Sequence, residues 1–223
     1  MSVSFSTILS SLRLNLRDPN TTTWSDEQLG ELTNRGIDAV SAVYPNETID
    51  SVAYTQPVSG SVFTVALSNV RWVTRVDVYD NDGKFRETVR PSSGDGPNSG
   101  WETHGGILSL PPRYSLSAGT GTFKIVGYGD WLPISCTYTT AGVAVSPSTA
   151  TTNLDTAALN AVKVFVEAEA LSMLTLDRAQ YQQWQVSRGA ADLSALGMNN
   201  LALAAQQRWR QEQRKIRRLR KWG

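Results

Sequence analysis

Residues 24–45 read WSDEQLGELTNRGIDAVSAVYP, and this stretch decides the fold of the first part of the chain. Ser25 can cap a helix, and Gln28, three residues later, can complete a capping box. Trp24 precedes the cap and Leu29 occupies the fourth helical position, which is the spacing of a hydrophobic staple. The Tyr-Pro pair at 44–45 closes the stretch, because proline disfavours helix at the residue before it. We therefore predict a helix that begins after Ser25.

Apolar side chains at helical spacing give this helix a core-facing stripe of Leu29, Leu32, Gly36, Val40 and Val43. Gly36 costs about 1 kcal/mol of helix propensity relative to alanine. It either lets another backbone approach closely or is tolerated without a packing reason. An earlier helix is predicted from Phe5, Ile8, Leu9, Leu12 and Leu16, and Asp18-Pro19-Asn20 stops it.

Residues 153–223 also have helical character. Asn153 or Asp155 can cap a helix that carries Leu159, Val162, Val166, Met173 and Leu174, with a break near 176–177. A second pattern follows through Tyr181, Trp184, Leu193, Leu196, Leu201 and Ala205, interrupted by Gly189 and Gly197. In the last segment, Ala205–Trp222, Trp209 and Ile216 lie seven residues apart on one predicted face.

The middle of the chain, by contrast, has short β-branched or aromatic runs bounded by Gly, Pro, Asn and Asp. The predicted strands are Ile49–Tyr54, Val62–Leu67, Trp72–Tyr79, Phe85–Val89, Ile107–Leu110 and Thr122–Tyr128, with a weaker extended region at Ile134–Val145. Asp82-Gly83 is a hairpin turn signal. Pro91–Gly100 is loop-like, and Ser146–Thr152 resembles a linker.

This order of helices, strands and helices predicts an α+β fold, since the element types are segregated and do not alternate. We expect the N- and C-terminal segments, 1–45 and 153–223, to pack together as a helical bundle. The segment 46–152 would then be an inserted antiparallel β domain.

The formal net charge of +1 conceals two opposite parts. From Arg208 onward, eight Lys or Arg face the single acid Glu212, a balance of +7; the remaining 13 bases and 19 acids give −6. The basic residues are Arg208, Arg210, Arg214, Lys215, Arg217, Arg218, Arg220 and Lys221. Such a tail can bind nucleic-acid phosphates, an anionic membrane or an acidic protein groove, and composition alone leaves these three targets open.

Several classes of protein are disfavoured by the residue types. The single Cys136 and single His104 disfavour a disulfide framework, a zinc site and a His-based catalytic triad. No phosphate-binding loop, nucleophile elbow or complete calcium loop is present in the sequence. The first residues do not resemble a signal peptide, and no apolar run is long enough to span a membrane. We expect a soluble, non-enzymatic protein without a cofactor, made in a reducing cytosol.

Particular stretches resemble the head-to-tail adaptor proteins of tailed bacteriophages, also called head completion or connector proteins. The stretches are LRLNLRD (12–18), WSDEQL (24–29), LTNRGI (32–37) and Val43-Tyr44-Pro45, followed in 153–223 by a helix, a segment bearing Trp184 and an Arg-rich helix. The resemblance covers about 1–45 and 153–223. The sequence departs from the family where Gly36 replaces the more usual alanine and where the β section is long.

The resemblance implies a structural role in the neck of the virion, for a protein made in the host cytoplasm. Such adaptors form a ring, typically of twelve subunits, which lies under the portal protein and receives a stopper or tail-completion protein. Double-stranded DNA passes through the lumen without sequence-specific contact. By this resemblance, the C-terminal segment, Ala205–Trp222, would bind the portal. Trp209, Ile216 and Trp222 would anchor it, while Arg210, Arg214, Lys215, Arg217, Arg218, Arg220 and Lys221 would meet portal acids.

Two other functions remain open at this stage. The chain could bind nucleic acid directly through its basic tail, in which case DNA affinity would fall steeply with salt. It could also bind carbohydrate or protein through Trp72, Trp101 and Trp131 of the β section, although core packing is the commoner role of such side chains.

Overall fold

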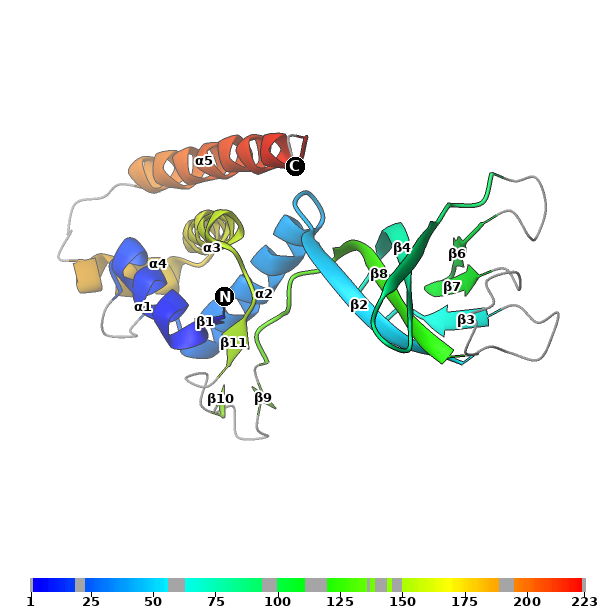
Figure 1. The fold of residues 1–223 in the computed structure, drawn as a ribbon. Helices are drawn as coiled ribbons and strands as arrows, with labels where there is room; N and C mark the ends of the chain where they lie inside the picture. Colours follow the sequence, from blue (N-terminus) through cyan, green and yellow to red (C-terminus); the bar gives the residue numbers. More distant parts are fainter. Residues whose placement is uncertain are drawn as a thin grey trace. The chain divides into compact units, whose positions relative to one another are not determined.

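The computed structural model describes residues 2–18, 23–55, 63–93, 100–110, 120–135, 137–138, 144–145, 150–188 and 195–221. The fold is α+β, as predicted, with helices and antiparallel sheets in separate parts of the chain (Figure 1). The chain divides into a helical unit, Met1–Tyr44 with Trp131–Gly223, and a β unit, Pro45–Asp130.

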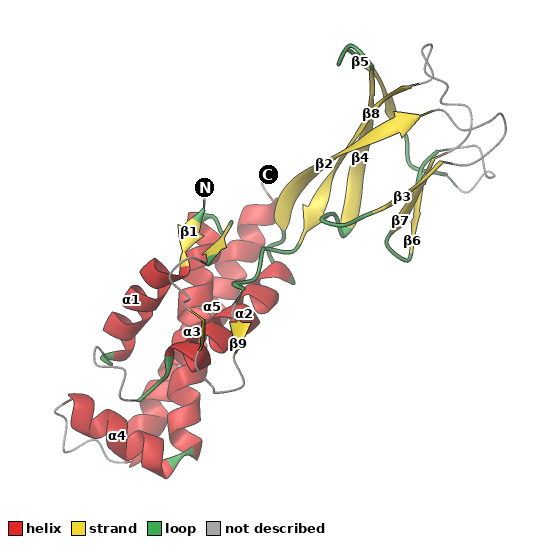
Figure 2. Cartoon of the chain, turned by 90° about the horizontal axis from the view of Figure 1, so that it is seen from below, coloured by secondary structure: helices red, strands yellow, loops and turns green. Residues whose placement is uncertain are grey.

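The helical unit is built around α3 (Thr156–Leu176), against which α1 (Phe5–Leu16), α2 (Asp26–Ser41) and α5 (Ala195–Lys221) pack (Figure 2). The shorter α4 (Arg178–Arg188) follows α3 directly, so the break predicted near 176–177 is confirmed. The helical unit also contains two short antiparallel strand pairs. One joins β1 (Val3–Ser4) to β11 (Thr151–Thr152), and the other joins β9 (Thr137–Tyr138) to β10 (Ala144–Val145).

Local sequence explains where these helices begin and end. Ser25 and Gln28 form the predicted capping box of α2, and Asp155 caps α3 by accepting a hydrogen bond from the Ala158 amide. Arg17 ends α1 in the left-handed conformation, with φ at 55°. The capping box at Ser25 was predicted, Asp155 was one of the two caps proposed for α3, and the left-handed Arg17 lies just before the predicted stop at Asp18-Pro19-Asn20.

Gly36 is a point of close packing between α2 and α3. A Cβ at this position would lie 3.0 Å from Phe165 Cδ1 and 3.2 Å from Val162 Cγ1. The close approach at this glycine is therefore made by side chains of α3, and the nearest backbone atom, the Val162 carbonyl oxygen, would lie 3.5 Å from such a Cβ. Glycine occupies this position despite its low helix propensity, because a side chain there would press on α3.

The β unit contains two sheets. One has the strand order β2 (Asn46–Thr55), β8 (Thr120–Gly129), β4 (Trp72–Asp80), β5 (Phe85–Val89); the other has β3 (Phe63–Ala66), β7 (Ile107–Leu110), β6 (Glu102–His104). All pairings between these strands are antiparallel. The predicted hairpin joins β4 to β5, with Gly83 at φ 73°. A core of aliphatic side chains forms around Tyr54 and Phe123, whose rings meet edge to face at 4.7 Å.

The predicted domain boundary at 152 requires correction, because the helical unit resumes at Trp131. The Trp131 indole donates to the Tyr44 carbonyl at 2.7 Å, and its amide donates to Ser41 Oγ. Asn34 forms hydrogen bonds with both the amide and the carbonyl of Ile134. Trp131 and Ile134 belong to the helical core, so the strand-like composition of this region did not indicate its partners. Strand β6 was not predicted, since its three residues are exposed and carry no apolar pattern.

Candidate interaction surface

The basic C-terminal segment is part of α5, and α5 is held along α3 by an apolar face. Met198, Ala202 and Ala205 are buried on this face, and Ile216 has no exposed surface. Trp209 is partly buried and packs edge to face on Phe165 of α3, with ring centroids 5.2 Å apart. The spacing of four, three, four and seven residues keeps these side chains on one side of the helix. The second half of α5 is therefore fixed to the helical unit.

The opposite face of α5 carries an arginine stripe, defined as Arg210, Arg214, Arg217 and Arg218. All four are exposed, and their spacing of four, three and one places them on one helix face. Within the described part of the chain, none of them has an ion-pair partner. An unpaired row of guanidinium groups on a supported helix is suited to carboxylates or phosphates, because arginine offers a planar fork of donors.

Two other basic residues of the segment are used within the chain. Arg208 donates to Glu167 of α3 at 3.0 Å, and Lys215 donates to Glu212 at 3.1 Å. Both basic side chains are more than half exposed, so each ion pair contributes at most about 1 kcal/mol. The Arg208 pair joins α5 to α3 and the Lys215 pair lies within α5, so both basic side chains are less available to a partner than the arginine stripe.

The structure separates the residues predicted to bind the portal into different groups. Arg210, Arg214, Arg217 and Arg218 lie together on the exposed face. The expected role of Ile216 as an anchor for a partner needs correction. Its side chain is buried in this chain's own core, so it is not accessible to a partner while α5 is packed on α3. Trp209 is likewise occupied with Phe165. Arg220 and Lys221 continue the helix, while Trp222 lies outside the described residues.

An acidic stripe on α2 was not recognised from the sequence as a surface. Glu27, Glu31 and Asp38 are spaced by four and seven residues, so they share the face of α2 turned away from its buried side. Glu31 and Asp38 are exposed, and no ion pair joins either of them to another described residue. The sequence signal that could have identified this stripe is the spacing of its three acids by four and seven residues.

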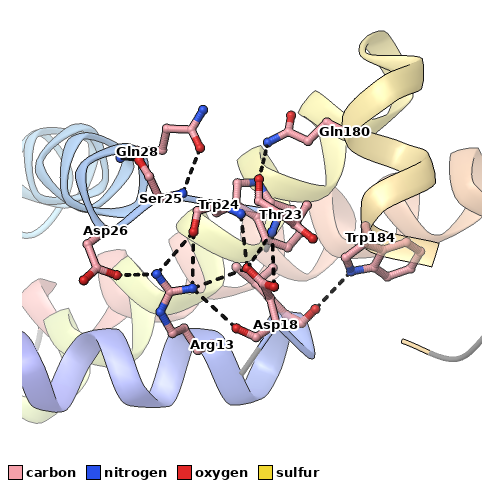
Figure 3. Close-up of polar contacts among 10 residues, drawn as sticks. Arg13, Asp18, Thr23, Trp24, Ser25, Asp26, Gln28, Gln180 and Trp184 are labelled. Atoms are coloured by element: carbon pink, nitrogen blue, oxygen red, sulfur yellow. Dashed lines mark hydrogen bonds and ion pairs between the residues drawn. The ribbon is translucent and has the colours of Figure 1, made fainter. Parts of the chain in front are cut away.

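A buried polar cluster fixes the turn between α1 and α2 (Figure 3). Arg13 is almost fully buried and donates to the Trp24 carbonyl, to Asp18 at 3.3 Å and to Asp26. The Asp18 carboxylate, which has no exposed surface, also accepts from the amides of Thr23 and Trp24. Arg13 and Asp18 pair with each other and with neighbouring groups inside the chain, so the cluster links the end of α1 to the start of α2.

Gln180 and Trp184 of α4 join the same region. The Gln180 amide donates to the Thr23 carbonyl at 2.9 Å, and the Trp184 indole donates to the Leu16 carbonyl at 3.0 Å. Trp184, which the adaptor resemblance had singled out, therefore ties α4 to the end of α1. Its role in this chain is to hold the helical unit together.

The remaining candidates provide no assembled site. Trp131 is buried, Trp101 donates to the Val89 carbonyl and packs on the β core, and Trp72 is the most exposed of the three. His104 is exposed at the end of β6, and Cys136 lies outside the described residues. Across the described ranges, no group of three metal-ligating side chains is close enough to hold an ion. In the same ranges, no helix is both long and apolar enough to cross a membrane.

No protein-family model matches the chain, and no curated protein matches it either.

Proposed function

We propose that this chain is a structural head-to-tail adaptor of a tailed bacteriophage. In this proposal it forms a ring beneath the portal protein in the virion neck, and a stopper or tail-completion protein binds the ring on the tail side. The observation that carries the proposal is the arginine stripe, which stands on a helix fixed to α3 and has no ion-pair partner among the described residues.

The chemistry of the stripe is compatible with a protein partner that presents carboxylates. Arginine forks bind carboxylates bidentately, and a helix already held in place loses little further conformational freedom on binding. Ile216 and Trp209 supply that support from within the chain. The docking surface is therefore the basic side chains of 210–221, and the apolar residues that had been expected to anchor it have a supporting role.

The distribution of charge is compatible with DNA as cargo. The chain outside the basic segment carries a net charge of −6, and acidic surfaces repel the phosphate backbone. Double-stranded DNA would pass the adaptor without sequence-specific contact, while the basic segment remains engaged with protein.

The test is co-purification with the portal protein encoded in the same phage genome. Truncation before α5 is unsuitable, because it would remove Trp209 and Ile216 from the helical core. The informative variant replaces Arg210, Arg214, Arg217, Arg218 and Arg220 with Gln together with K221Q. A matched control makes the same change at Arg17, Arg35, Arg71, Arg86 and Arg90 together with K84Q, all exposed in this structure. Loss of portal co-purification in the first variant only is expected; retention in both would refute docking through α5.

Direct nucleic-acid binding is the second candidate, because the same unpaired arginines would also fit phosphates. Six neutralised phosphates predict a slope of about −5 for the logarithm of DNA affinity against the logarithm of salt concentration. Fluorescence anisotropy with a double-stranded oligonucleotide measures this slope. A steep slope that disappears in the six-site variant supports the second candidate, and absence of binding at low salt eliminates it.

A further inference from the structure

Two oppositely charged stripes on the helical unit match in spacing. Glu31 and Asp38 of α2 lie seven residues apart, and so do Arg210 and Arg217 of α5. At a rise of 1.5 Å per residue, both intervals are about 10 Å long. All four side chains are exposed, and no ion pair links any of them to another described residue.

The two stripes of one chain cannot pair with each other. The buried sides of α2 and α5 both pack against α3, and the charged stripes occupy the sides turned away from it. Figure 1 shows α5 and α2 on different sides of α3. Each stripe therefore faces outward, where a group that pairs with it would belong to another molecule.

We propose that Arg210 and Arg217 of one copy bind Glu31 and Asp38 of a second copy of this chain. The occupant is identified by charge complementarity and by the equal seven-residue interval, which allows both ion pairs to form at once between two helices laid side by side. The contact joins two different surfaces, so one copy keeps a free acidic stripe, the other keeps a free arginine stripe, and further copies can be added. Contacts of this kind close into a ring when the rotation between neighbours permits.

This inference rests on the proposed function, because it names the surfaces that join neighbouring subunits of the proposed ring. It assigns Arg210 and Arg217 to the neighbour and leaves Arg214, Arg218, Arg220 and Lys221 of α5 for the portal. Since the pairs are exposed, the contact weakens as salt rises.

A charge-swap experiment on the whole chain tests the contact without the portal. One variant carries E31K and D38K, a second carries R210E and R217E, and a third carries all four changes. Sedimentation velocity over a concentration series, in 50 mM and in 500 mM salt, measures self-association. Circular dichroism at 222 nm checks that each variant retains its helices.

Each two-site variant is expected to self-associate roughly 30-fold more weakly than the wild-type chain, since two attractive pairs become repulsive. The four-site variant is expected to recover wild-type association, and so is an equal mixture of the two two-site variants. Wild-type chains that stay monomeric at every concentration would overturn the inference, as would weakened association that the four-site variant does not restore. Portal co-purification is measured separately, so it distinguishes failure of this contact from failure of the adaptor proposal.

Discussion

Substitution of Ile216 by alanine tests whether the basic segment is supported from within the chain. Ile216 has no exposed surface and lies in the helical core where α5 meets α3. Because the site is fully buried, the whole cost of a large-to-small core substitution applies, about 3 kcal/mol. If α5 opens from α3 as a unit, this cost raises the opening equilibrium constant about 150-fold.

Hydrogen exchange followed by mass spectrometry measures this opening directly. Peptides from α5 should exchange up to about 150-fold faster in the variant, while peptides from β2 and β8 should be unchanged because they belong to the β unit. The matched control is Leu203→Ala, on the same helix but 56% exposed, which should change the free energy of unfolding by no more than about 0.5 kcal/mol.

An unchanged exchange rate in α5 after Ile216→Ala would refute the reasoning. It would mean that Ile216 contributes nothing to the docking of α5 on α3. The result would then favour the sequence-based expectation that Ile216 contacts a partner. Equal acceleration in the Leu203→Ala control would also count against the reasoning, because loss of helix contacts would no longer depend on burial.

Three further predictions concern the helical unit. Arg13→Ala should lower the free energy of unfolding by about 3–5 kcal/mol, measured in urea by circular dichroism, because it leaves the buried Asp18 carboxylate without its cation. Gly36→Val should lower it by about 1–3 kcal/mol in the same assay, since even a Cβ would press on α3. Desolvation, with a hydrogen bond to Asp155, raises the pKa of Tyr44 to about 12. The folded protein then keeps a proton that the unfolded chain releases near pH 10. The contribution of Tyr44 to stability should therefore be constant below pH 10 and fall between pH 10 and 12, a fall that Tyr44→Phe should reduce.

Each of these predictions has a matched comparison. Arg35→Ala removes an exposed ion pair with Glu169 and should lower the free energy of unfolding by at most about 1 kcal/mol. A loss in Arg13→Ala that is no larger than this would contradict the role of the buried cluster. Gly36→Ala should be far milder than valine, because helix propensity offsets the tighter contact. A Tyr44→Phe variant that loses as much stability between pH 10 and 12 as the wild type would assign that loss to other groups.

The sequence specified best those features that depend on neighbouring residues. Capping at Ser25 and Asp155, the break near 176–177 and the Asp82-Gly83 hairpin depend on a few adjacent side chains and the backbone between them. The segregated order of helix and strand patterns was sufficient for the α+β class. Residues 131–152 were assigned to the wrong unit because their composition describes an extended chain and does not indicate what that chain packs against.

The sequence by itself determined that a dense basic segment closes this chain and that the segment is helical. Only the tertiary structure decided which of its residues remain available, because burial depends on contacts between segments far apart in sequence. Ile216 and Trp209 turned inward to α3, about 40–60 residues earlier, while Arg210, Arg214, Arg217 and Arg218 turned outward. Helical spacing places residues on a common face, but the packing partner determines whether that face meets the core or solvent.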